Sequence, residues 1–227
     1  MLWEEKPGTV TDLSLKDGKL SFMASGIEGN ALIAVTDDSD KILWSWHIWV
    51  TDQPQEQTYV NDKGTFHVLD RNIGATRSDR GTGEEWRASR GLLYQWGRKD
   101  PFMQKGYSNI YTSQLYLYEV VEQPTHFIRT SHWTLEWRQK LWSTETKTIY
   151  DPCPIGYRVA VSDIWDGFVF PDQNGVRVEQ INVSGSYDKG WKFRVNKDNP
   201  DIISWYPATN VFDEYINYEY DHLNDWT

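Results

Sequence analysis

The alternation of apolar and polar residues is clearest in the stretch from Ile42 to Asp52, which reads ILWSWHIWVTD. Side chains of a strand alternate between two faces, so every second residue from Ile42 onward lies on one apolar face. A helix would spread these residues around its axis, and Trp and β-branched residues favour strands. We predict a central strand with Trp44, Trp46 and Ile48 in the core, where Trp46→Ala costs about 3–5 kcal/mol.

A hairpin is predicted before this strand. The dipeptide Asp-Gly at positions 17 and 18 suits the positive φ angles of a tight two-residue turn. That turn pairs Leu15 with Leu20 and Leu13 with Phe22, which places the apolar residues of both strands on one face.

The domain organisation follows from the next turn signals. Residues 31–36 (ALIAVT) have a strand pattern, and the acidic turn after them leads back into the central strand. Residues 1–52 are therefore expected to form a small four-stranded antiparallel unit. The polar, Pro-containing segment DQPQEQ that follows is the best candidate linker, so residues 53–227 form the second predicted domain.

Short helices are expected among the strands of this second domain. Apolar spacing predicts one helix from Glu84 to Trp96 and another across Trp133, Trp137 and Leu141, and a third has Ser162 as its N-cap. Strands begin at Thr65 and recur in the last third of the chain, and this mixture indicates the α+β class. The late strands have the sequences VRVEQINV, GWKFRV and IISWY, within residues 176–206.

Charge restricts the partners. The 227-residue chain has a formal net charge of -10 and a pI near 4.9, so phosphate backbones would repel it and no nucleic-acid partner is expected. No run of 18 apolar residues is present, which predicts no membrane insertion by this segment. The N-terminus MLWEEKPG lacks the features of a signal peptide, so we expect a soluble, mature segment.

Residues with catalytic or metal-binding chemistry are few. Cys153 is the only cysteine and lies between two prolines, which favours a structural thiol over a nucleophile and excludes an internal disulfide. His47 lacks His or Cys partners at ligand spacing, so a packed residue is favoured over a metal ligand. Asp37, Asp38 and Asp40 offer oxygens to calcium but lack the Gly and distal Glu of an EF-hand. Calcium is thus not indicated, and no cofactor, metal site or catalytic residue is predicted.

Four charged residues are interpreted as structural. Asp70 and Arg71, together with Arg98 and Asp100, are expected to form a charge network that also includes the intervening Lys99 and joins two sequence motifs. No oriented base and nucleophile can be named among them, so this role ranks above catalysis.

Four motifs resemble a known family. They are LDRNIGAT, GLLYQWGRKDPF, YDPCPIGYRV and WYPAT, between Leu69 and Thr209, and the lead-in from Gly29 to Asp52 fits as well. The set is similar to the Fibrobacter succinogenes major paralogous domain, which occurs in surface lipoproteins and fimbrillin-like proteins of Bacteroides. The resemblance implies a C-type lectin-like fold at the cell surface. The chain departs from the family at Ala160, where Pro is usual, and after WYPAT, where a Gly-rich segment and a final Tyr-Trp-Ser-Ser strand are missing.

Three functions follow from this resemblance. The first is an extracellular, non-catalytic binding module, such as an adhesin or a fimbrial domain, that recognises glycan or protein. The second is a purely structural subunit of a surface assembly. The third is an enzyme related to the formylglycine-generating oxidases, which the single cysteine disfavours because that chemistry relies on a pair of thiols.

The C-terminal segment supplies the predicted ligand-binding residues. Residues 210–227 mix aromatic with acidic side chains, which disfavours both a dry core and a typical disordered tail. We expect an exposed surface that contributes to recognition, and deletion of residues 211–227 should weaken binding while leaving folding intact. A frayed domain end is the alternative. The binding residues of this hypothesis are Tyr215, Tyr218, Tyr220 and Trp226.

Overall fold

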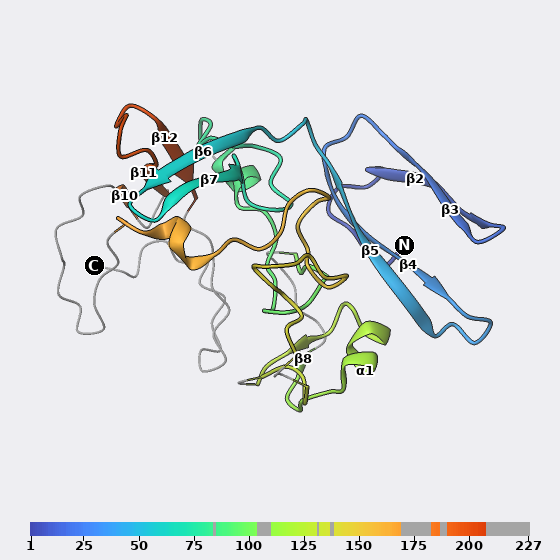
Figure 1. The fold of residues 1–227 in the computed structure, drawn as a ribbon. Helices are drawn as coiled ribbons and strands as arrows, with labels where there is room; N and C mark the ends of the chain where they lie inside the picture. The colour runs from blue at the N-terminus through green and yellow to red at the C-terminus, as the bar shows by residue number, and fades with distance from the viewer. Residues whose placement is uncertain are drawn as a thin grey trace. The chain divides into compact units, whose positions relative to one another are not determined.

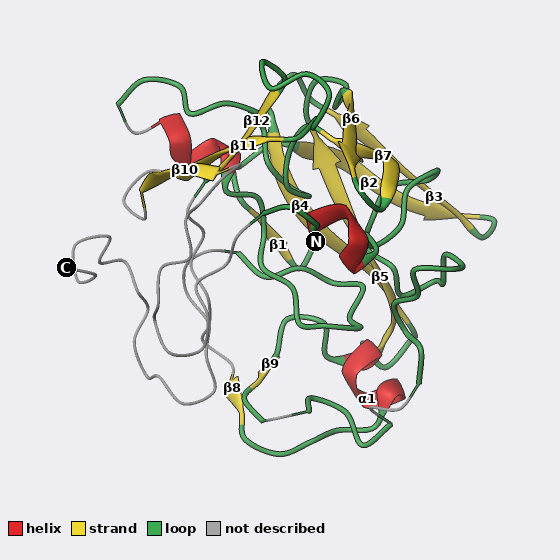
Figure 2. Cartoon of the chain, turned by 60° about the vertical axis from the view of Figure 1, so that its left-hand side comes forward, coloured by secondary structure: helices red, strands yellow, loops and turns green. Residues whose placement is uncertain are grey.

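The computed structural model describes residues 1–83, 85–103, 110–130, 132–136, 139–168, 183–186 and 190–207. These residues form small, mostly antiparallel sheets, and only 9% of them are helical. Loops make up much of the chain (Figure 2). The β-rich character expected from the sequence is therefore confirmed.

The chain divides into two compact units, which are described separately. The first contains Met1–Asp52 and Leu92–Arg158, and the second contains Gln53–Gly91 and Val159–Val211. Both units combine segments that are distant in sequence.

In the first unit, β2 (Val10–Lys16) and β3 (Lys19–Ala24) form the predicted hairpin (Figure 1). The Leu15–Leu20 pair is confirmed, and Asp17 and Gly18 have the expected positive φ angles of 50° and 71°. The predicted pairing of Leu13 with Phe22 is wrong because the register shifts between Thr11 and Ser14. This shift is a β-bulge, at which the strand contains an extra residue without a partner.

The second sheet of this unit has three strands. Its order is β1 (Trp3–Glu4), β4 (Gly29–Thr36), β5 (Ile42–Val50), and both pairings are antiparallel. The single four-stranded unit predicted from the sequence is therefore wrong, because the hairpin is a separate two-stranded sheet. The two-residue strand β1 near the N-terminus pairs with β4 in its place.

Burial along strand β5 differs from the prediction. The strand at β5 is confirmed, but Trp46 is 37% exposed, and Trp44 and Ile48 are half-buried. The buried residue of β5 is Ser45, which lies on the opposite face from Trp46. The reason is the sheet order: β4 lies between two strands and is buried over most of its length, whereas β5 has β4 on one side only.

The rest of the first unit is built around a small apolar core. Its buried residues are Val120, Ile128, Trp133 and Leu141. They come from helix α1 (Leu117–Glu122), strand β9 (Phe127–Ile128) and the following loops, and β9 pairs in parallel with β8 (Ile110–Tyr111). The described part of residues 133–141 contains no helix, so that prediction is wrong. Trp133 and Leu141 are buried, and Trp137 lies outside the described residues.

The second unit pairs short strands with two 3-10 turns. Strands β6 (Glu56–Asn61) and β7 (Gly64–Leu69) form one hairpin, and β10 (Val183–Ser186), β11 (Gly190–Arg194) and β12 (Ile203–Tyr206) form a three-stranded sheet. The 3-10 turns are η1 (Glu85–Ser89) and η2 (Ser162–Trp165). Its buried core residues are Tyr59, Ile164 and Val195, with several aromatic rings packed around them.

Two helix predictions in this unit need correction. The expected helix from Glu84 to Trp96 is limited to the five residues of η1, and Gly91 has a φ of +72°. A Cβ at Gly91 would lie 2.5 Å from the carbonyl oxygen of Ile73, so a close backbone contact, not a helix, determines this glycine. Ser162 is the first residue of η2 and not its N-cap, which is Val161.

Candidate functional site

Helix α1 presents the most pronounced exposed aromatic pair in the described part of the first unit. The helix is short, and its buried side faces the apolar core through Val120 and the half-buried Leu117. Tyr118 lies on the exposed side of the helix, and Tyr116 is the residue just before its first turn. The helix packs against strand β5.

The rings of Tyr116 and Tyr118 stack on each other. Their centroids are 5.8 Å apart, and the angle between the ring planes is 12°. The two residues are 48% and 61% exposed, respectively. We call this exposed pair the aromatic platform; the stacked rings cover each other's inner faces, so their outer faces and edges are open to a ligand.

Two carboxylates fix the backbone beneath the aromatic platform. The backbone N–H of Tyr116 donates to Oε2 of Glu119 at 2.7 Å, and that of Leu117 donates to Oε2 of Glu136 at 2.6 Å. These N–H groups at the helix start have no partner within the helix. The carboxylates therefore satisfy them and also place negative charge beside the rings.

An ion pair borders the platform on another side. Nζ of Lys41, in the turn between β4 and β5, lies 2.7 Å from Oε1 of Glu122. The hydrogen bond to Glu122 raises the pKa of Lys41, and the Tyr118 ring oxygen contributes in the same direction. Tyr118 and Glu122 are four residues apart in α1, so they lie on the same side of the helix, and the platform has a charged pair beside its apolar rings.

Arg98 holds the other end of α1. Its guanidinium is buried and donates to the carbonyl oxygens of His126 at 2.7 Å and Pro124 at 3.1 Å, and to Oε1 of Gln95 at 2.9 Å. Burial lowers the pKa of Arg98 to about 10, which leaves it charged at neutral pH. Arg98 thus orders the chain that follows α1, a role that differs from the predicted charge network.

Asp100 belongs to a buried polar cluster on β5. Its Oδ1 accepts from Ser45 Oγ at 2.8 Å and from Lys99 Nζ at 2.7 Å, and Lys99 also donates to the Ser45 carbonyl at 2.9 Å. The Lys99 ammonium lies 4.4 Å from the centre of the Trp44 ring. Burial lowers the pKa of Lys99, and Asp100 opposes this shift. The Lys99 ammonium is committed to this ion pair, so it is not available as a base for Ser45.

His47 lies on the same side of β5. Nδ2 of Asn30 donates to Glu5, so Oδ1 of Asn30 accepts from Nε2 of His47 at 2.9 Å. Nδ1 of His47 is then the acceptor for the hydroxyl of Tyr94 at 3.3 Å. Burial lowers the pKa of His47 to about 4, so the ring is neutral at physiological pH. This arrangement is that of a packed, hydrogen-bonded histidine.

The remaining predicted residues fall in other places. Asp70 and Arg71 are both buried in the second unit and form a two-point ion pair, with Nε to Oδ1 at 2.8 Å and Nη2 to Oδ2 at 3.2 Å. The proposed network with Arg98 and Asp100 spans both units and stays a prediction. The four predicted ligand-binding residues lie outside the described residues: Tyr215, Tyr218, Tyr220 and Trp226.

Cys153 lies in a loop near Asp151. Its backbone N–H donates to Oδ1 of Asp151 at 2.9 Å, and its carbonyl accepts from Lys147 at 2.6 Å. Burial, followed by the charge of Asp151, raises the pKa of the thiol to about 12. The thiol is therefore protonated at neutral pH, which makes it a poor nucleophile.

Metal-ligating groups do not gather in the described residues: no cluster of three or more His, Cys, Asp or Glu residues could hold an ion there. Oδ1 of Asp37, one of the three residues considered for calcium, instead accepts from the N–H groups of Ser39 at 2.9 Å and Lys41 at 3.0 Å. Among the described residues, no helix is long and apolar enough to cross a membrane.

Comparison with known proteins gives no family: no family model, no curated protein and no solved structure matches the chain.

The aromatic platform was not predicted from the sequence. The spacing of Leu117, Val120 and Val121 in LYEVVE is that of one apolar helix face, which would have placed Tyr118 on the other side. The segment was too short to stand out beside the Trp-rich strand.

Proposed function

We propose that the chain is a non-catalytic binding module of a cell-surface protein, with a C-type lectin-like fold, and that it recognises a glycan through the aromatic platform. The observation that supports the proposal is the parallel, exposed ring pair of Tyr116 and Tyr118. The fold and the extracellular location rest on the resemblance of the sequence motifs.

The chemistry of the platform suits a sugar. The apolar C–H face of a pyranose ring can lie flat on an aromatic ring, while its hydroxyls need donors and acceptors at the edge. Glu119, Glu122 and Lys41 provide both kinds of group near the rings. A protein ligand would use the same rings as anchors, because Tyr is enriched at the centres of protein interfaces.

A non-catalytic role is supported by the state of the reactive groups. The Cys153 thiol is protonated, His47 is neutral and held by two hydrogen bonds, and Lys99 is paired with Asp100. Each of these groups has a packing role that accounts for its position.

The test is a glycan array probed with the parent chain, followed by Tyr118→Ala and Tyr116→Ala on any glycan that binds. Loss of a stacking ring should weaken binding by about fivefold or more, since an aromatic ring stacked on a flat ligand contributes roughly 1–3 kcal/mol. Ile149→Ala is the matched control, because Ile149 is 71% exposed and outside the platform. Glycan binding that survives both Tyr substitutions would refute this site.

A structural subunit is the second candidate function, and one observation favours it. The β2–β3 hairpin exposes the apolar side chains of Leu13, Leu15 and Phe22, which an assembly could cover.

A further inference from the structure

Three carboxylates surround the aromatic platform. Glu119 and Glu136 accept hydrogen bonds from the backbone at the start of α1, and Glu122 follows Tyr118 by four residues on the same side of the helix. All three side chains are half-buried, so each still meets the solvent. Their charges therefore act on any ligand that approaches the rings.

One basic residue faces these carboxylates. Nζ of Lys41 pairs with Glu122 at 2.7 Å, and the backbone N–H of Lys41 donates to Oδ1 of Asp37 at 3.0 Å. The hydrogen bond to Glu122, followed by the charges of Glu122 and Asp37, raises the pKa of Lys41. Together with Glu119 and Glu136 this makes four carboxylates and one ammonium, which leaves a local net charge of -3 at neutral pH.

The guanidinium of Arg98 does not reverse the sign of this charge. It is buried and contacts the carbonyl oxygen of Gln123, at the other end of α1. Burial lowers the pKa of Arg98 and the charge of Asp100 raises it, so a carboxylate acts on the guanidinium from nearby. Even counted in full, Arg98 leaves the surroundings of the platform negative.

The start of α1 offers no donors to an acidic ligand. Unpaired N–H groups at a helix start ordinarily attract anions. In α1 the N–H groups of Tyr116 and Leu117 already donate to Glu119 and Glu136, at 2.7 Å and 2.6 Å. A carboxylate or sulfate on a sugar would meet negative charge at the place where a helix usually provides donors.

We infer, on the basis of the proposed glycan-binding function, that the aromatic platform selects its ligand by charge. It binds sugars without acidic groups and rejects sugars that carry a carboxylate or a sulfate. The rings of Tyr116 and Tyr118 supply the stacking surface, which suits any pyranose with an apolar face. The carboxylates around the rings supply the discrimination.

Coulomb's law sets the expected size of this discrimination. A unit charge at about 8 Å in water changes affinity by roughly twofold, so an excess of two or three charges changes it by roughly fivefold to tenfold. Most of this effect remains in 0.01 M salt, where the screening length is about 30 Å, and it is lost in 1 M salt, where the length is about 3 Å. Steric exclusion of a bulky group would not depend on salt.

The experiment is a glycan array in which each neutral glycan is printed beside its sulfated and sialylated forms, probed with the full chain. Calorimetric titration of each pair that binds gives the affinities. Sulfation should weaken every interaction that depends on Tyr118 by about fivefold or more in 0.01 M salt. In 1 M salt the difference between the two forms should fall below about twofold.

A double substitution tests whether the neighbours of the rings are responsible. Glu119→Gln combined with Glu122→Gln removes two negative charges and retains amide oxygens as acceptors. The difference between the neutral and sulfated forms should then fall to about twofold in low salt. If this variant fails to fold, the salt dependence of the parent chain still decides.

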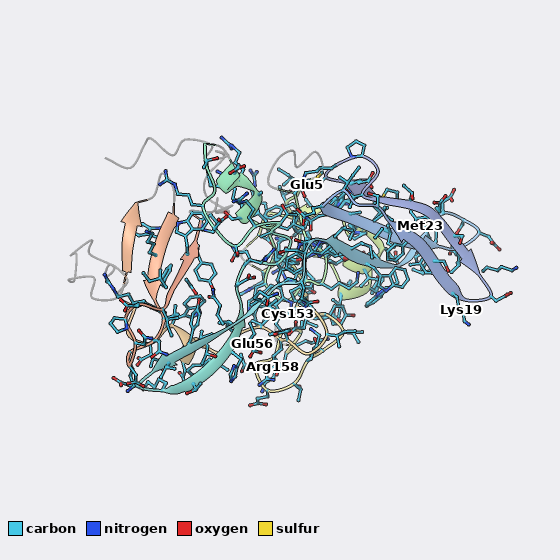
Figure 3. The ribbon with its side chains drawn as sticks, turned by 90° about the horizontal axis from the view of Figure 1, so that it is seen from above. Glu5, Lys19, Met23, Glu56, Cys153 and Arg158 are labelled. Carbon is cyan, nitrogen blue, oxygen red and sulfur yellow. The ribbon has the colours of Figure 1, made fainter. Side chains whose placement is uncertain are left out.

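The matched control removes two charges elsewhere in the first unit. Asp12→Asn combined with Asp17→Asn makes the same change in net charge on the β2–β3 hairpin, and Asn tolerates the positive φ angles of both positions. Figure 3 shows Lys19 at the free end of this hairpin, which is separated from α1 in both ribbon views (Figures 1 and 2). The control should retain the full difference between the neutral and sulfated forms.

The outcomes separate the charge selectivity from the proposed function. An array without a glycan that depends on Tyr118 refutes both. A glycan that depends on Tyr118 and binds as well or better when sulfated, in low salt, overturns the selectivity alone. So does a preference that persists in 1 M salt, which indicates steric exclusion, or one that the hairpin control reduces as much as the Glu variant does, which indicates overall charge.

Discussion

The two hairpins of the first unit have similar patterns but opposite surroundings. Both β2–β3 and β4–β5 connect through short turns, and both alternate apolar and polar side chains. Yet the first is exposed on both sides, whereas β4 is buried over most of its length and its partner β5 contributes hydrogen bonds from Ser45 and His47. Alternation thus defines which residues share a face but not which face becomes covered.

The largest expected effect comes from breaking the polar cluster that covers β5. Asp100→Ala leaves the buried Lys99 ammonium without its ion-pair partner and Ser45 without its acceptor. Loss of one member of a buried pair costs about 3–5 kcal/mol, which denaturant unfolding would measure.

A second Lys-Asp pair serves as the control for that experiment. Lys197 and Asp198 are also adjacent in sequence, with a distance of 2.9 Å against 2.7 Å, but their side chains are 47% and 68% exposed. Asp198→Ala should cost no more than about 1 kcal/mol. Equal costs for the two substitutions would mean that burial does not decide the strength of the Lys99–Asp100 pair.

The pH dependence of stability tests the same side of β5 through His47. Its pKa is about 4 in the folded state and 6.5 in the reference state, so the unfolded chain binds the proton more readily. The contribution of His47 is complete above pH 6.5 and is lost as the pH falls towards 4, by about 3 kcal/mol in total. Urea unfolding across this range measures it.

Two variants isolate the contribution of His47 to that pH dependence. His47→Gln should reduce the pH slope, whereas His132→Gln, at an exposed position, should retain it. A slope that persists in His47→Gln would assign the effect to other groups.

Smaller effects are expected for Trp46, on the less covered side of β5, and for the exposed hairpin. Because Trp46 is 37% exposed, Trp46→Ala should cost about 1–2 kcal/mol, below the range for a core Trp. Ile33, its direct partner on β4, is 1% exposed, and Ile33→Ala should cost more. Leu15→Ala on the exposed hairpin should stay within about 0.5 kcal/mol. Thermal unfolding of the three variants would rank them, and a Trp46→Ala cost equal to that of Ile33→Ala would restore the core assignment.

Features that depend only on residues close together in the sequence could be predicted. The Asp17-Gly18 turn, the Leu15–Leu20 pair and the strand at β5 follow from turn preference and alternation. The place of the hairpin could not be predicted, because the short strand β1 competes with it for the edge of β4, and two residues give no periodic signal.

The candidate site was harder to predict for a related reason. The acceptors of Arg98 lie 26 and 28 residues further along the chain, and the acceptor of Ser45 lies 55 residues away. Such distant pairs leave no trace in a single sequence. The helix predicted from Glu84 failed because spacing of apolar residues was weighed above Gly91, whose conformation is incompatible with a helix.

The buried guanidinium of Arg98 has a consequence for sequence variation. Helices commonly end at a glycine in the left-handed conformation, but Gln123, which ends α1, has a φ of -130°. Arg98 supplies the donors for the carbonyls beyond the helix, so this helix end does not depend on a left-handed glycine. The constraint moves to position 98, where a lysine cannot reproduce the fork of donors. A single residue in a distant loop, Arg98, therefore limits how the sequence around the aromatic platform can change without loss of this order.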